Sequence, residues 1–111
     1  MRGAVAIIQP EMAHTGVTQF KRICTLAREY DVLIAPHATI GVGIFLAASL
    51  HATAATKNVL AHEYQHSIFD RVTPMMKGDM RCESGAYSLP TGSGVGVEPR
   101  DELWKNAVLI K

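Results

Sequence analysis

Short apolar runs alternate along this chain with longer helical patterns, and this alternation limits the folds that the chain can adopt. The runs at residues 4–8 and 32–35 are rich in aliphatic and β-branched side chains, and a proline follows each of them closely. Between them, from Val17 to Tyr30, apolar side chains recur at steps of three and four, which is typical of an amphipathic helix. The runs therefore indicate strands buried on both faces, and the intervening helix favours parallel pairing.

The same alternation continues beyond the second run. Residues 39–43 make a glycine-containing connection that we expect to be flexible. Residues 44–56 are apolar around most of a helical circumference, which predicts a helix packed between other elements. Residues 59–61 are a third strand candidate. The order of strand, helix, strand, helix and strand predicts an α/β fold with parallel strands joined by crossover helices.

The last third of the chain has a different texture. Residues 68–82 are methionine-rich and mixed, and residues 85–96 carry repeated glycine turn signals around short extended pieces. Residues 103–110 form a terminal segment that is either helical or extended. The G-x-G-x-G pattern within residues 91–96 lacks the helix signal and the lysine of a phosphate loop, so we expect a turn there.

Length, charge and cysteine content exclude several classes of protein. With 111 residues, the chain can form one domain with a core, but it is well short of the roughly 250 residues of a complete α/β barrel. The net charge is +1 and the charges are dispersed, so neither nucleic acid nor a membrane is an expected partner. Cys24 and Cys82 lie far apart and belong to no C-x-x-C pattern, which fits a protein of the reducing cytoplasm.

The run from His62 to His66 spells H-E-x-x-H, which on a helix is the zinc-binding pattern of metalloproteases. In that case the two histidines would bind the ion, Glu63 would be the general base, and Glu83 would be available as a third ligand. Against a helix, Asn58 ends the preceding one, and residues 59–61 are too few to begin another. A zinc metalloprotease is therefore one alternative function.

Three titratable side chains follow the three predicted strands, at the positions where parallel sheets and barrels carry their active sites. Glu11 follows the first strand, His37 the second and Glu63 the third. His37 could act as a general base, Glu11 could orient its imidazole, and a protonated Glu63 could donate to a developing oxyanion. Each also has a structural interpretation, as a strand cap, a turn residue or a solvated acid.

Several segments, in order and with suitable spacing, resemble one known family. They are residues 7–11, 15–18, 34–37, 58–63 and 90–98. Together they resemble the C-terminal part of the mandelate racemase and muconate-lactonizing branch of the enolase superfamily. Within it, the likeness is to acid-sugar members such as galactonate-type dehydratases and galactarolactone cycloisomerases. The resemblance covers nearly the whole chain.

The resemblance implies that residues 1–83 are the sixth, seventh and eighth strand units of a TIM-type (β/α)7β barrel, which is incomplete in this chain. Residues 84–111 would be a tail that returns toward a capping domain. His37 would be the seventh-strand base, which moves a proton at the carbon beside the substrate carboxylate. Glu11 would lie near the sixth-strand acid that pairs with this base. Glu63 would be the eighth-strand acid, which hydrogen-bonds the enolate oxygen.

The chain departs from the family pattern in three respects. Thr15-Gly16 stands where two glycines are usual, and Glu11 replaces the usual aspartate, with Pro10 at that position if the spacing is gapless. Residues 93–96 read Ser-Gly-Val-Gly where Pro-Gly-Leu-Gly is typical. The family's three acidic magnesium ligands and second-strand lysine lie on earlier strands, which this chain does not contain.

We therefore predict the C-terminal part of a Mg²⁺-dependent dehydratase or cycloisomerase, a lyase or isomerase that abstracts the proton α to a carboxylate and forms an enediolate. The resemblance implies an acid-sugar or sugar-lactone substrate, a missing N-terminal barrel and capping domain as partners, and a full-length homo-oligomer. With open sheet edges and no metal ligands of its own, the isolated chain is expected to be inactive and to fold poorly or associate. A non-catalytic remnant or assembly module is the other alternative.

Overall fold

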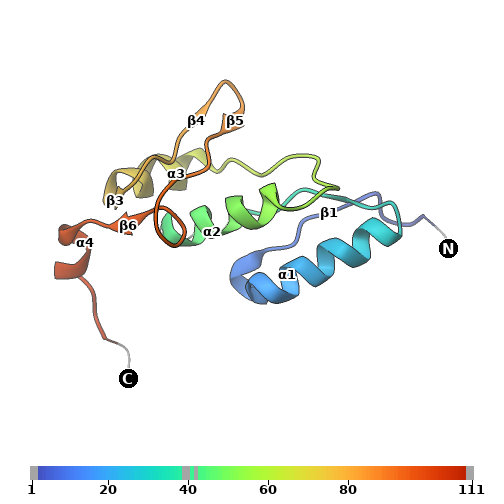
Figure 1. Cartoon of the computed structure of the whole chain (residues 1–111), viewed down its shortest axis with the longest axis horizontal. Coiled ribbons are helices and arrows are strands. Elements are labelled where there is room, and N and C mark those ends of the chain that lie inside the picture. The colour runs from blue at the N-terminus through green and yellow to red at the C-terminus, as the bar shows by residue number, and fades with distance from the viewer. Residues whose placement is uncertain (1–2, 39–40, 42, 110–111) are drawn as a thin grey trace.

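The computed structural model describes residues 3–38, 41 and 43–109. The N-terminal part consists of two short strands and two helices that lie side by side (Figure 1). Strand β1 spans Ile7–Ile8, helix α1 spans Met12–Glu29, strand β2 spans Leu33–Ile34 and helix α2 spans Gly43–Ala54. The predicted order of strand and helix is confirmed for these elements.

The strands of this part pair in parallel, as the crossover helices require. The register of β1 and β2 places Ile7 opposite Leu33 and Ile8 opposite Ile34. On its other side, Ile34 forms a parallel bridge with Val59, which lies in the third predicted strand. The predicted α/β fold with parallel strands is therefore confirmed.

The ends of several elements differ from the sequence predictions. Helix α1 begins at Met12 and not at Val17, because a first turn forms ahead of Gly16, whose φ of 70° and ψ of 164° interrupt the helix. The third strand is reduced to the single bridge at Val59. The first strand is not buried on both faces, since Ile7 is 44% exposed where the described chain supplies no covering element. The predicted connection at 39–43 includes residues 39, 40 and 42, which lie outside the described residues.

The C-terminal part is built from short elements, as its mixed sequence indicated (Figure 1). They are helix α3 (His66–Val72), the 3-10 helix η1 (Thr73–Met75), strands β3 (Met76–Lys77), β4 (Cys82–Glu83), β5 (Ala86–Tyr87) and β6 (Glu98–Pro99), and helix α4 (Asp101–Lys105). Strand β3 pairs with β6 and β4 with β5, both antiparallel. The terminal segment is helical at its start, although its helix begins at Asp101, before the predicted position.

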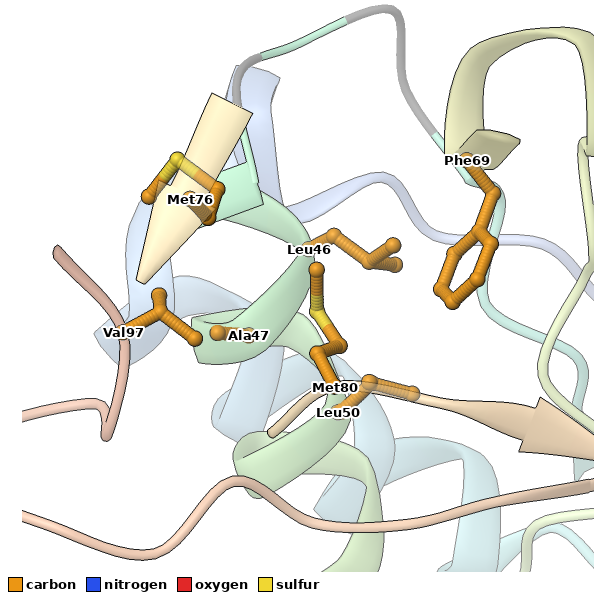
Figure 2. Close-up of a cluster of buried hydrophobic side chains, with 7 residues drawn as sticks. All are labelled: Leu46, Ala47, Leu50, Phe69, Met76, Met80 and Val97. Carbon is orange, nitrogen blue, oxygen red and sulfur yellow. The ribbon is translucent and has the colours of Figure 1, made fainter. Parts of the chain in front are cut away.

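Helix α2 joins two hydrophobic clusters. One cluster packs it against α1 and β2 and is formed by Met12, Phe20, Cys24, Ala27, Ile34 and Ala52. The other packs it against the C-terminal part and is formed by Leu46, Ala47, Leu50, Phe69, Met76, Met80 and Val97 (Figure 2). The prediction of a helix enclosed between other elements is confirmed. Neither this helix nor any other in the described residues has the length and apolarity needed to cross a bilayer.

Candidate active site

The sheet brings the three predicted strand-end residues together. Nδ1 of His37 lies 3.1 Å from Oε2 of Glu11, within hydrogen-bond distance. Nε2 of the same imidazole lies 3.6 Å from Oε2 of Glu63. The imidazole therefore stands between two carboxyl groups, one at each ring nitrogen. Such convergence follows from parallel strands, whose carboxyl ends lie at one edge of the sheet.

Backbone hydrogen bonds that continue past the strand ends fix the spacing of these three residues. The amide of His37 donates to the carbonyl of Pro10 at 3.2 Å, and the amide of Glu63 donates to the carbonyl of Pro36 at 3.1 Å. Each bond therefore ends on the residue just before Glu11 or His37. Because a proline ring locks φ near −65°, both acceptor positions are held in restricted backbone conformations.

Glu11 is the most enclosed of the three side chains. It is 18% exposed, against 48% for His37 and 38% for Glu63. Glu11 is the residue that precedes helix α1, with extended dihedral angles. Since the helix begins earlier than predicted, His14 lies one turn further along, with Nε2 at 3.5 Å from the Glu11 carboxyl. The Glu11 carboxyl group therefore faces two imidazoles, those of His37 and His14.

Glu63 is held by hydrogen bonds to both its side chain and its main chain. The amide of Ala38 donates to Oε2 at 2.7 Å. The Glu63 carbonyl accepts hydrogen bonds from the Tyr87 hydroxyl and from Nδ1 of His62, both at 2.9 Å. Because Oε2 is already an acceptor, a proton on this carboxyl group would lie on Oε1. Oε1 is therefore the oxygen that does not bind the Ala38 amide.

The H-E-x-x-H run does not form one helix. Residues 61–65 lie outside any helix or strand, and α3 begins only at His66. His62 points inward, with Nε2 at 2.9 Å from the Ser49 hydroxyl and Nδ1 bonded to the Glu63 carbonyl. Burial lowers the pKa of His62, which favours the neutral ring. The two histidines do not share a helical face, so the geometry of a zinc protease is not formed.

In the ranges 3–38, 41 and 43–109, no group of three or more His, Cys, Asp or Glu side chains is arranged so that it could hold a metal ion. Glu83, the third ligand of the zinc alternative, lies on β4 at 3.7 Å from the Arg81 guanidinium. The described residues therefore do not fit a Mg²⁺ ion by themselves, and ligands for one would have to come from outside this part of the chain.

One known family matches nearly the whole of this chain. The family described as enolase C-terminal domain-like matches residues 1–103, which include all three strand-end residues. This chain belongs to the enolase superfamily. Strands β1 and β2 and the Val59 segment, with helices α1 and α2, are thus strand-helix units of an incomplete barrel of this superfamily, as the resemblance implied.

Individual members of the superfamily match this chain in sequence or structure over most of its length. A D-galactonate dehydratase from Xanthomonas axonopodis pv. citri (strain 306) is 31% identical over 112 residues, which cover 95% of this chain and 29% of the dehydratase. The crystal structure of a candidate isomerase from Sinorhizobium meliloti is 55% identical, with a TM-score of 0.88, and the match covers 94% of this chain and 28% of the isomerase.

A third relative is an enolase superfamily member from Agrobacterium tumefaciens. It is 49% identical with a TM-score of 0.86, and the match covers 90% of this chain and 26% of that protein. This chain therefore spans less than a third of the length of each of these three relatives. The three relatives are named as a dehydratase, a candidate isomerase and a member of the enolase superfamily.

Two residues that contact the site were not predicted from the sequence. Tyr87 lies on β5, far from any strand end that points to the site, and its contact with Glu63 depends on how the β4–β5 hairpin folds back. The sequence carried one signal for Ser49, because it is a polar residue in a mostly apolar helix that was expected to be buried. A buried hydroxyl needs a partner, and here the partner is His62.

Proposed function

We propose that this chain is the C-terminal barrel part of an acid-sugar dehydratase or cycloisomerase that removes the proton α to a carboxylate. The observation that carries the proposal is the His37 imidazole, which has Glu11 at one ring nitrogen and Glu63 at the other. Imidazoles commonly serve as general bases because they exchange protons near neutral pH. The dehydratase and isomerase names of the relatives support this class of reaction.

In this proposal His37 takes the proton through Nε2. The Glu11 carboxylate accepts the hydrogen bond from Nδ1–H at 3.1 Å, which leaves the lone pair on Nε2. Once Nε2 has gained the proton, the imidazolium is stabilised by the same carboxylate, since hydrogen bonds between ionised groups are stronger than those between neutral ones. Glu11 therefore selects the tautomer before the reaction and stabilises the charge after it.

Glu63 acts on the oxygen of the substrate carboxylate. Loss of the α-proton places negative charge on that group and forms an enediolate, which needs a hydrogen-bond donor. A proton on Oε1 of Glu63 can supply this bond while Oε2 remains bound to the Ala38 amide at 2.7 Å. The enediolate then expels the hydroxyl group of the neighbouring carbon, which leaves as water with the proton that His37 accepted. In a lactone, the ring oxygen leaves from that carbon instead and opens the ring.

We propose that this reaction requires segments that the chain does not contain. A Mg²⁺ ion supplies positive charge opposite the enediolate in the implied family chemistry. The described residues offer no group of carboxylates to hold it. The match to less than a third of each relative is consistent with ligands on the remaining strands.

Two exposed apolar surfaces support the proposal that further barrel strands and a capping domain pack against this chain. A cavity of about 400 Å³ lies beside β1 and α1, where a preceding strand and helix would pack. It is lined by Gly3, Ala4, Val5, Ile8, Ile23, Leu26, Ala27, Tyr30 and Val32. At the other end of the molecule, α4 lies away from α1 (Figure 1), and Trp104 and Leu109 are largely exposed. We propose that residues 1–83 complete a barrel and that residues 84–111 reach a capping domain.

The test completes the barrel with segments from a relative. This chain replaces the matching segment of the Sinorhizobium meliloti protein, which is 55% identical to it. We call the product the completed barrel. With Mg²⁺ present, we expect it to exchange the α-proton of an acid sugar for deuterium and to convert that sugar. The unmodified relative, assayed on the same panel of acid sugars, identifies the substrate.

The base is tested in the same protein. His37→Asn keeps a polar side chain but removes the proton acceptor, so α-proton exchange should fall by about 10²–10⁴-fold. Thermal unfolding should stay close to that of the parent protein, because His37 is half exposed. A folded completed barrel that exchanges no substrate of the relative would reject the proposed function, and so would full exchange by His37→Asn.

A further inference from the structure

The segment that carries Glu63 depends on side chains for its position. Residues 61–65 lie between the Val59 bridge and α3 and belong to no helix or strand. The Glu63 amide is bonded to the carbonyl of Pro36, as in a continued sheet. The Glu63 carbonyl, by contrast, accepts its two hydrogen bonds from the side chains of His62 and Tyr87. These two side-chain donors take the place of the backbone hydrogen bonds between parallel strands, which end at this point.

Tyr87 reaches Glu63 from the C-terminal part. Its hydroxyl donates to the Glu63 carbonyl at 2.9 Å. Its ring packs edge-on against His62, with ring centroids 5.5 Å apart, and against Phe69 at 5.8 Å. Burial raises the pKa of Tyr87, so the phenol remains a neutral donor at physiological pH. The ring contacts fix the direction in which this donor points.

His62 links the Glu63 carbonyl to helix α2 through hydrogen bonds at both ring nitrogens. Since Nδ1 donates to the Glu63 carbonyl, Nε2 is the acceptor for the hydroxyl of Ser49 at 2.9 Å. Ser49 is 1% exposed and lies within the packed helix. The carbonyl is therefore held from two sides, by α2 through His62 and by β5 through Tyr87.

We propose that Tyr87 is a positioning residue, which holds the Glu63 peptide so that its carboxyl group faces Nε2 of His37. This inference rests on the proposed function, in which Glu63 and His37 act on one substrate. With the amide and the carbonyl of Glu63 both bonded, the direction of its Cα–Cβ bond is set. The Ala38 amide then captures Oε2 at 2.7 Å, and Oε1 is left to donate.

The variant Tyr87→Phe in the completed barrel removes the hydroxyl and keeps the ring. Loss of one neutral hydrogen bond should lower kcat by about tenfold and change KM by less than about twofold, because the lost alignment matters in the transition state. The matched control is Tyr64→Phe. Tyr64 packs in the same aromatic group, 5.9 Å from Tyr87, but its hydroxyl bonds Asp70 on the surface. We expect this control to leave kcat and KM unchanged.

A double-mutant cycle separates positioning from general stability. If Tyr87 acts through the Glu63 carboxyl group, Tyr87→Phe should have little further effect on kcat in a Glu63→Gln background, since coupled residues are not additive. An equal loss in both backgrounds would overturn the inference. An equal loss in Tyr64→Phe would also overturn it.

Hydrogen exchange keeps this inference distinct from the proposed function. The Ala38 amide, measured by mass spectrometry on its peptide without substrate, should exchange about tenfold faster in Tyr87→Phe than in the parent or in Tyr64→Phe. An unchanged Ala38 amide overturns the positioning role, whatever the activity. If Ala38 responds but the parent turns over no acid sugar, the proposed function fails and the positioning of Glu63 stands.

Discussion

The two ends of the molecule are held together by different kinds of contact. In residues 3–61, helices of 18 and 12 residues pack beside a parallel ladder of backbone hydrogen bonds. In residues 62–109, the α-helices have only 7 and 5 residues and the 3-10 helix has 3. The strands of both regions have two residues each. Because the helices of residues 62–109 are short, side-chain bonds to backbone carbonyls carry more of the structure there, as from Tyr87 to Glu63 and from Arg100 to Pro74. Similar bonds, such as that from Lys21 to Ala55, supplement the longer helices of the first region.

This difference predicts which substitutions destabilise the fold and which affect only the candidate site. Periodic elements share their stability among many equivalent bonds and a buried apolar face, so their integrity depends on core packing. Short elements depend on individual side chains. Glu63 lies where the two regions meet, because its amide bonds Pro36 in the first and its carbonyl bonds Tyr87 in the second.

The strongest test of this comparison is a pair of core truncations in the completed barrel. Phe20 is fully buried between α1 and its neighbours, so Phe20→Ala should lower the free energy of unfolding by about 3–5 kcal/mol. Phe69 lies on the seven-residue helix α3 and is 8% exposed. Phe69→Ala should lower it by only about 2 kcal/mol, since the short elements around it can relax. Denaturant unfolding measures both, and equal losses would contradict the comparison.

Smaller losses of stability are expected when two glycines with positive φ, one in each region, are replaced by alanine. A Cβ at Gly96 would lie 2.8 Å from the Pro90 backbone, and its φ is 75°. Gly96→Ala should therefore destabilise by about 2–3 kcal/mol through combined strain and clash. Gly16 has a φ of 70° but open space around its Cβ position, so Gly16→Ala should destabilise by only about 1 kcal/mol. A larger loss at Gly16, measured by thermal unfolding, would show that backbone strain outweighs packing.

The smallest expected effect is a pH dependence of stability at the junction. Burial lowers the folded-state pKa of His62 below its ordinary value of 6.5. The unfolded chain therefore binds a proton that the folded chain resists, and stability increases with pH. The contribution of the buried, neutral His62 to stability is fully present above pH 6.5. It is lost as the pH falls from 6.5 through the lower folded-state pKa. Denaturant unfolding between these limits should show this slope, and His62→Gln should remove it. An unchanged slope in that variant would assign the effect to another group.

The sequence was sufficient to predict the first region and the convergence of three side chains at the edge of its sheet. Apolar runs and helical spacing are local signals, and they located β1, α1, β2 and α2 in order. Because parallel strands end at one edge, the same signals predicted that Glu11, His37 and Glu63 would meet. Their catalytic roles stay a prediction. The enolase superfamily match tests the family and the fold but not the function of each side chain.

The rest could not be predicted because it depends on contacts between distant residues. Nothing local in β5 specifies that the Tyr87 hydroxyl bonds a carbonyl 24 residues earlier in the chain. The early start of α1 depends on Gly16, which permits a positive φ inside the helical range. The reduction of the third strand to a bridge at Val59 reflects an open sheet edge, which sequence periodicity does not encode.

The backbone bonds at Pro10 and Pro36 also determine which insertions the site could tolerate during evolution or engineering. An added turn at the far end of α1 or α2 leaves the sheet register unchanged. A single residue inserted at 59–61 would reverse the alternation of side chains in this segment, so that His62 would take the outward position and Glu63 would turn toward Ser49. Lineages of this chain should therefore accumulate length changes in their helices and almost none between Val59 and Glu63.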